Sequence, residues 1–315
     1  MSKCGCYLSW LLLLCSTICV SQENIQFIES QLGHQQSSMF IDEQLYGLAK
    51  FRAAEGTGVL NRPTPLPDYT EIDKNKLHIE ALSLIILDES VADDIAELAI
   101  HKYPDSEFIP QSTRALADFY YIRNDYKNAV KYYDQIDFDN FLDVGLSFRQ
   151  AYSHFVLKEF KESSTALSRI KNLRSPYYDA ANYYYAMSAY FLNNYPSAIR
   201  SLELVQEHPV YKKYNPYYLG QLYFAQGDLD KMIQYVEPRL LEEDIYNKNQ
   251  LHKLVGQAYM RQSNYHKALE HLEIYERNTE KLTEIEFYQI AVSYYHIDHC
   301  LCTVQAQSTT KQSHQ

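Results

Sequence analysis

The chain has 315 residues, of which 46% are apolar, so it can bury one large core or a series of small ones. Glycine and proline are scarce, at 9 and 10 residues, which argues against sandwiches and barrels with many tight turns and favours helices. A net charge of -11 would repel a phosphate backbone, so no nucleic acid partner is expected.

The chain opens with a segment typical of a secretory signal peptide. Lys3 is followed by an apolar run from about Tyr7 to Val20, which is short for a membrane span and is interrupted by serine and threonine. A basic start, an apolar middle and a small residue before the cut predict cleavage after Ser21. We therefore expect residues 1–21 to be the signal peptide and the mature chain to be exported. The alternative is an uncleaved N-terminal anchor.

Residues 22–75 are predicted to hold one helix, at 36–55, and a linker rich in glycine and proline, at 56–69. Residues 76–109 resemble a degenerate pair of helices. The second helix of this pair has acidic residues in its first turn, and its expected buried stripe is Ile95, Leu98 and Ala99.

From residue 110 a spacing recurs. The aromatic or leucine residue that begins every second helix returns after 34, 35, 34 and 36 residues; these residues are Tyr126, Phe160, Tyr195, Leu229 and Tyr265. Small residues nine positions earlier keep the same period; they are Ala117, Ala151, Ala186, Gly220, Gly256 and Ala291. A period in the mid-thirties with two helical stripes predicts an all-α, right-handed solenoid of helix-turn-helix repeats.

This pattern resembles the tetratricopeptide repeat (TPR) family of exported bacterial type. The matching features are a small residue and a tyrosine three apart in the first helix, the aromatic marker, and small and large apolar residues in the second helix. Residues 256–275 match at every such position, whereas the copy at 213–248 has Leu229 and Met232 where tyrosine and alanine are usual. The resemblance implies about five and a half repeats over 110–298.

A second stripe runs beside the core stripe of every first helix. In tetratricopeptide repeats this flank usually lines the concave surface, so the resemblance implies a groove rich in tyrosine. Its residues are Arg114, Tyr121, Phe148, Phe155, Tyr183, Tyr190, Tyr217, Phe224, Lys253, Met260, Tyr288 and Tyr295. The rings either pack against one another as a wall, or bind a peptide segment, or stack on sugar rings.

The last helix of the pattern has expected core residues Phe287, Ile290, Ala291 and Tyr294 and a second apolar flank beside them. We expect the second flank of this last helix to pack against either a further repeat or a partner. Residues 299–315 are predicted to be a disordered tail. His296, His299, Cys300 and Cys302 fit no common zinc spacing, so we expect no metal and no cofactor.

The sequence contains no phosphate-binding loop and no nucleophile or metalloprotease motif, so we expect no enzyme. The expected function is a protein-interaction scaffold of the cell envelope, in the periplasm or associated with the outer membrane, with a protein or peptide partner and a possible membrane-associated complex. The alternatives are a module that binds an envelope glycan, or the ectodomain fragment of a longer sensor. The oligomeric state stays open.

Overall fold

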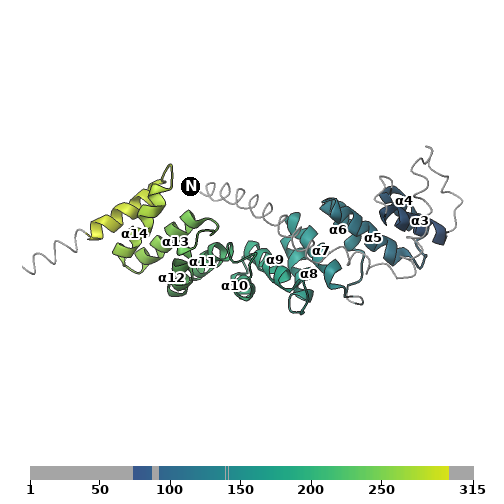
Figure 1. The fold of residues 1–315 in the computed structure, drawn as a ribbon, viewed down its shortest axis with the longest axis horizontal. Helices are drawn as coiled ribbons and strands as arrows, with labels where there is room; N and C mark the ends of the chain where they lie inside the picture. Colours follow the sequence, from purple (N-terminus) through teal and green to yellow (C-terminus); the bar gives the residue numbers. More distant parts are fainter. Residues whose placement is uncertain (1–73, 87–91, 139, 141, 298–315) are drawn as a thin grey trace, which may run out of the picture. The chain divides into compact units, whose positions relative to one another are not determined.

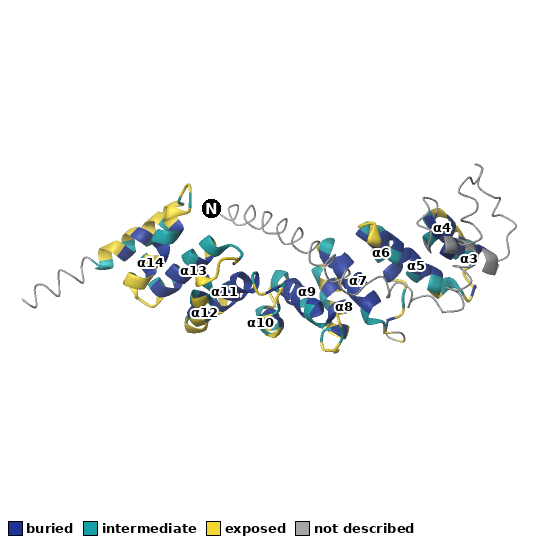
Figure 2. Cartoon of the chain, viewed as in Figure 1, coloured by how far each residue is buried: buried dark blue, intermediate teal, exposed yellow. Residues whose placement is uncertain are grey.

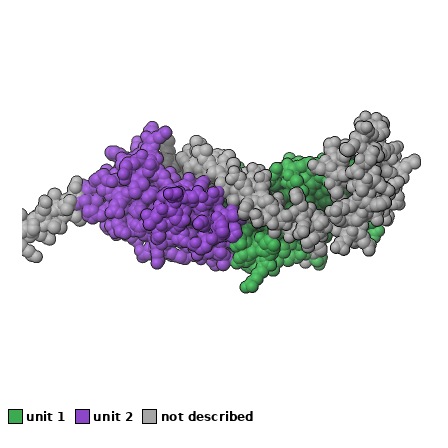
Figure 3. Space-filling model, in the orientation of Figure 1, with its two compact units in different colours: residues 1–192 green, residues 193–315 purple. Residues whose placement is uncertain are grey.

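The computed structural model describes residues 74–297 apart from 87–91, 139 and 141 (Figure 1). The expected signal peptide, the helix at 36–55, the linker and the tail at 299–315 lie outside the described residues. The chain divides into two compact units, at residues 1–192 and 193–315, which are coloured separately in Figure 3.

The described part of unit 1 consists of helices that pack on their neighbours in the sequence. Its helices are α3 (Lys74–Ile86), α4 (Ala92–Lys102), α5 (Ile109–Ile122), α6 (Tyr126–Tyr133), α7 (Val144–Val156), α8 (Phe160–Ile170) and α9 (Tyr178–Phe191). First helices also contact the first helices of the next pair, as α5 does with α7 and α7 with α9. Such stacking of two-helix modules gives a core shared between neighbours.

The described part of unit 2 follows the same plan. Its helices are α10 (Tyr195–Leu204), α11 (Asn215–Gln226), α12 (Leu229–Val236), the short 3-10 helix η4 (Glu237–Leu241), α13 (Lys248–Arg261), α14 (Tyr265–Arg277) and a further helix over 284–297. The second helices begin at the five marker residues that the spacing predicts, from Tyr126 to Tyr265. The all-α class and the helix-turn-helix repeat are therefore confirmed within each unit.

The turn inside each pair has one conformation. The residue two positions before each marker has a left-handed backbone, with φ between 59° and 81°; these residues are Asn124, Lys158, Asn193, Gly227 and Ser263. In the α7–α8 turn, the backbone N–H of Lys158 donates to the carbonyl of Phe155 at 3.0 Å, and the N–H of Glu159 donates to that of His154 at 2.9 Å. These bonds satisfy the last carbonyls of the first helix, and the chain can reverse in three residues.

The small residues of the first helices lie at close contacts. Ala117, Ala151 and Ala186 are fully buried, and a Cβ atom on Gly256 would lie 2.7 Å from Cγ of Leu272 in α14. The expectation that a neighbour presses close here is confirmed for the buried copies. Ala291 is the exception: it is exposed on the helix over 284–297.

Two expected core stripes need correction. In α4, Ile95 and Ala99 are buried as expected, but Leu98 is exposed, because Ala92 and Ala96 complete the buried side instead. In the helix over 284–297, only Ile290 of the four expected core residues is buried, since no described helix follows to cover the others.

Unit 1 has an aromatic core. Tyr152 and Tyr184 are fully buried with their ring centroids 5.3 Å apart, and both contact Phe148. Perpendicular and offset ring pairs of this kind stabilise a core beyond the area they bury, by about 1 kcal/mol for each pair. The high tyrosine content of the chain is thus used inside unit 1 as well as on its surface.

Candidate functional site

The residues expected in the groove are mostly covered in unit 1. Tyr121, Phe148, Phe155 and Tyr183 are all buried among other rings. Phe148, for example, lies 5.0 Å from the ring of Tyr177, which comes from the loop before α9. These four rings are covered by other rings, so the interpretation that the flank rings pack against one another as a wall applies to them. Arg114 and Tyr190 are partly exposed.

The same flank is more open in unit 2. Tyr217 is buried against Tyr246, but Phe224 and Met260 are partly exposed, and Tyr288 and Tyr295 are exposed. Figure 2 shows the helix over 284–297, which follows α14, coloured as exposed over much of its length. The members of the expected groove that remain accessible therefore gather mainly in unit 2. Their binding role stays a prediction.

Phe224 and Met260 line a hollow of about 360 Å³ on unit 2. Its other lining residues are Gln257, Arg261 and Gln289, so the walls come from α11, α13 and the helix over 284–297. These are first helices of successive pairs. The hollow therefore lies on the face that the tetratricopeptide resemblance assigns to binding.

The chemistry of this hollow is mixed. The guanidinium of Arg261 lies over the ring of Phe224, with Cζ 4.1 Å from the ring centroid. Among the described residues, no carboxylate lies within ion-pair distance of Arg261. The side-chain amide Nε2 of Gln257 donates to Oε1 of Gln289 at 3.0 Å. An apolar floor, one cation and two amides suit a peptide side chain and its backbone groups.

Lys253, a further expected groove residue, is engaged in holding the helix over 284–297. Its Nζ donates to Oε1 of Glu286 at 3.0 Å, and the hydroxyl of Tyr275 donates to the same oxygen at 2.8 Å. Glu286 and Thr283 also bond to each other's backbone N–H groups, which caps the helix at its start. Burial by itself raises the pKa of Glu286, but these hydrogen bonds outweigh it and lower that pKa to about 2.

Sequence reasoning missed a polar contact that recurs between successive pairs in unit 2. A first-helix tyrosine donates its hydroxyl to a glutamate of the preceding pair, at 2.6 to 2.8 Å; the bonds are Tyr223 to Glu203, Tyr259 to Glu237 and Tyr294 to Glu273. The signal was present, because a glutamate precedes each of these tyrosines by 20 to 22 residues. In unit 1, Tyr120 makes longer bonds to Asp93 and Glu97.

A second hollow, of about 410 Å³, lies between α10, α11, α12 and η4. Lys231 and Arg239 line it, but each is already paired with a glutamate at 2.7 Å: Lys231 with Glu203 of α10, and Arg239 with Glu207 in the turn that follows α10. Its charges are therefore satisfied within the unit, in contrast to Arg261.

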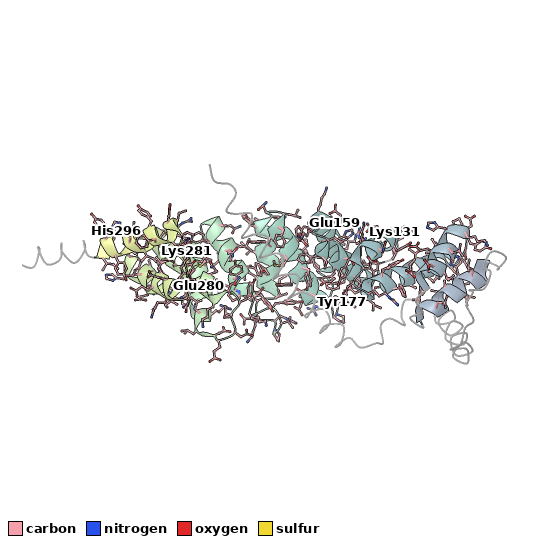
Figure 4. The ribbon with its side chains drawn as sticks, turned by 90° about the horizontal axis from the view of Figure 1, so that it is seen from above. Lys131, Glu159, Tyr177, Glu280, Lys281 and His296 are labelled. Atoms are coloured by element: carbon pink, nitrogen blue, oxygen red, sulfur yellow. The ribbon has the colours of Figure 1, made fainter. Side chains whose placement is uncertain are left out.

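Of the four residues whose spacing fits no common zinc site, only His296 lies within the described residues. His296 stacks on Tyr265 with ring centroids 4.1 Å apart, at the end of the last described helix (Figure 4). His299, Cys300 and Cys302 lie outside the described residues. Within the described ranges, no three histidine, cysteine or acidic side chains are grouped as metal ligands would be. No helix described here has the length and apolar character needed to cross a membrane.

No protein-family model matches the sequence, and none of the curated proteins matches it. Several solved structures are similar to it, at low identity and with TM-scores below 0.5. A structure of MamA AMB-1 is 17% identical, covers 55% of this chain and 92% of its own, and has a TM-score of 0.45. A tetratricopeptide repeat protein from Parabacteroides merdae ATCC 43184 is 13% identical over 70% of this chain and 98% of its own, with a TM-score of 0.35.

Proposed function

We propose that this chain, whose helix pairs have the fold implied by the tetratricopeptide resemblance, binds a protein or peptide partner without catalysing a reaction. The observation that carries the proposal is the hollow lined by Phe224, Met260 and Arg261 on the first helices of unit 2. Two of these residues belong to the flank that the sequence assigns to binding. The third is a cation with no carboxylate partner among the described residues.

The contacts suggest which partner would fit. An apolar side chain of the partner would lie against Met260 and the ring of Phe224, and a nearby acidic side chain would pair with Arg261. Oε1 of Gln257 and Nε2 of Gln289 make no hydrogen bond to a described residue, so both remain available to the partner's backbone. The hollow therefore favours an extended peptide segment in which an apolar residue stands beside an acidic one.

Affinity purification from the native source, followed by mass spectrometry, tests this proposal. The full chain is compared with Met260→Asp, which places a negative charge where the partner's apolar and acidic groups would lie. We expect the specific partner to be lost, or its affinity to fall at least tenfold, since burying an unpaired charge is costly.

Leu241→Asp is the matched control, because Leu241 is an exposed apolar residue of the same unit that does not line the hollow. It should retain the partner, and both variants should keep the helical circular dichroism of the parent chain. Equal recovery of the partner by the Met260→Asp variant would show that binding takes place elsewhere.

We also propose that the chain acts outside the cytoplasm, in the periplasm or at the outer membrane. The support for this is the signal-like segment at residues 1–21, with its basic start and apolar run. N-terminal sequencing of the protein from its native source tests the proposal. A mature chain that begins at Gln22 supports it, and a chain that retains residues 1–21 contradicts the expected cleavage.

A further inference from the structure

Two histidine side chains meet between α13 and α14 in unit 2. Nδ1 of His252 on α13 lies 3.1 Å from Nδ1 of His271 on α14, and the ring centroids are 5.3 Å apart. We call these two residues the histidine pair. His271 is buried, with 8% of its surface exposed, and His252 is partly buried. The pair lies about one helical turn from Gly256, where the two helices are in close contact.

The contact between the two rings limits how many protons the pair can hold. A hydrogen bond between two ring nitrogens needs one N–H group and one lone pair, so only one Nδ1 atom can carry a hydrogen. Nε2 of His271 lies 3.3 Å from Oε1 of Glu237 in η4. Burial raises the pKa of Glu237, but hydrogen bonds from Tyr259 and His271 outweigh burial and lower it, so this carboxylate is ionised and accepts. The pair therefore accommodates one positive charge, on His271, whose N–H groups then point at Glu237 and His252.

The charged and titratable groups around the pair come from three elements. Within the described part of the chain, Glu237 of η4 is the carboxylate that bonds to the pair. It also accepts a hydrogen bond from the hydroxyl of Tyr259 in α13 at 2.7 Å and lies 3.7 Å from Nζ of Lys267 in α14. Lys248 of α13 places a further positive charge near the pair. Two lysines and one charged ring thus share this carboxylate, so the surroundings oppose a second charge on the pair.

We infer that the histidine pair is an acid-sensitive tie between α13 and α14, which holds while the pair carries no more than one positive charge and breaks when both rings are charged. With both rings charged, each Nδ1 carries a hydrogen, and two charged N–H groups 3.1 Å apart repel each other. His271 is buried and bonded to Glu237, so the partly buried His252 is the ring that moves away. Acid therefore removes a side-chain contact between the two helices.

The electrostatics of His252 agree with this geometry. Burial, the neighbouring His271 and Lys248 lower the pKa of His252 to about 4. An unfolded chain has the ordinary histidine pKa of about 6.5, so the unfolded state binds the proton more tightly than the folded state does. The contribution of the pair to stability is therefore complete above the unfolded pKa and decreases as the pH falls from there towards the folded pKa.

Nuclear magnetic resonance titration of the histidine rings in the full chain tests the tie directly. We expect His252 to titrate about one pH unit or more below an ordinary histidine in the parent chain. In His271→Gln it should titrate closer to the ordinary value, because the neighbouring charge is gone. His266→Gln is the matched control, since His266 is an exposed histidine of α14 outside the pair, and it should leave the titration of His252 unchanged.

Hydrogen exchange of the full chain, measured by mass spectrometry on peptides from α13 and α14, tests the consequence. The parent chain is compared with His252→Gln, which keeps a polar side chain at this position but gains no proton. The ratio of the exchange rates, parent over variant, should rise about tenfold between pH 7.5 and pH 4.5, since only the parent is destabilised by the second proton. Because parent and variant are compared at the same pH, the intrinsic dependence of exchange on pH cancels.

Two results overturn the inference: a His252 that titrates as an ordinary histidine in the parent chain, or a ratio of exchange rates that is the same at both pH values. Neither measurement involves a partner, so the outcome is independent of the proposed function.

If the proposed function also holds, the tie regulates it, because α13 supplies Gln257, Met260 and Arg261 to the 360 Å³ hollow. This regulation rests on the proposed function. At pH 4.5 the purified partner should bind the parent chain more weakly than it binds His252→Gln, and at pH 7.5 it should bind both equally. Equal binding at pH 4.5, with the ratio of exchange rates raised as expected, would contradict the regulation and leave the tie intact.

Discussion

His154 lies between two carboxylates in unit 1, and its protonation should affect the stability of that unit. Its Nε2 is 3.1 Å from Oδ1 of Asp134, and its Nδ1 is 2.8 Å from Oε2 of Glu159 (Glu159 is labelled in Figure 4). Gln150 donates to the same oxygen of Asp134 and so fixes the carboxylate. Burial lowers the pKa of His154, but the hydrogen bonds to the two carboxylates outweigh burial and raise that pKa above its ordinary value.

A raised pKa in the folded state means that the folded state binds the proton more tightly than the unfolded chain does. The stabilisation is therefore complete below the unfolded pKa of about 6.5 and is lost as the pH rises through the raised pKa of the folded state. We expect His154→Gln to lower the free energy of unfolding by about 1 kcal/mol at pH 6, since both carboxylates are half exposed, and by less at pH 8.

Urea unfolding of parent and variant at several pH values and constant ionic strength measures this difference. Other titrating groups in the unit, such as the buried His78, contribute equally to both proteins and cancel in the comparison. A difference that stays constant between pH 6 and pH 8, or that grows with pH, would show that the charged imidazole does not stabilise the fold.

At the scale of the helix pair, α13 and α14 approach each other closely at Gly256. A Cβ atom on Gly256 would lie 2.7 Å from Cγ of Leu272 and 3.1 Å from the carbonyl oxygen of Ala268. On Gly220, at the equivalent position of α11, the nearest atom would be a methyl group of Val236 at 3.0 Å, with no backbone atom among its nearest contacts. Only at Gly256 does the backbone of the second helix lie close enough to resist a methyl group.

We therefore expect Gly256→Ala to destabilise unit 2 by about 1–3 kcal/mol, because α14 has to move away from α13. Gly220→Ala should cost less, since a side chain can adjust and alanine favours the helix. Thermal unfolding of the two variants, followed by circular dichroism, provides the comparison. If Gly220→Ala proved the more damaging, the contact between α13 and α14 would not set the spacing of the pair.

The period of the sequence predicts the helix pairs because the features that define a pair are local. The marker at Phe160, the turn residue Lys158 and the small residue Ala151 belong to one stretch of chain, and their register follows from helix geometry. The same reasoning identified Phe224 and Met260 as flank residues, and the hollow on unit 2 is lined by both.

The sequence does not predict which flank rings are covered, because the covering residues lie in loops outside the period. Tyr177, before α9, covers Phe148, and Tyr246, before α13, covers Tyr217. Met260, by contrast, lines the open hollow on unit 2. The spacing of residues within helices carries no information on where a connecting loop places its side chains. Only the structure therefore shows which residues of the flank are exposed.

At the scale of the whole molecule, the two units differ in how far the rings of the flank are covered. In unit 1 the flank rings Tyr121, Phe148 and Tyr183 are enclosed, so they stabilise this unit. In unit 2, Tyr288 and Tyr295 are exposed, and the hollow lies on the same set of first helices. Both proposals concern unit 2, whereas the flank rings of unit 1 belong to its stable aromatic core.

The enclosed rings also determine the near-ultraviolet circular dichroism of the protein. The chain has one tryptophan, Trp10, which lies outside the described helices, so the near-ultraviolet signals of residues 74–297 come from tyrosine and phenylalanine. Rings with centroids 5 to 6 Å apart in a fixed asymmetric arrangement, such as Tyr152 and Tyr184, couple their electronic transitions. Unit 2 holds similar pairs, such as Tyr217 with Tyr218 and with Tyr246. Near-ultraviolet dichroism of the unlabelled protein would consequently follow the melting of the ring clusters in both units, without any introduced chromophore.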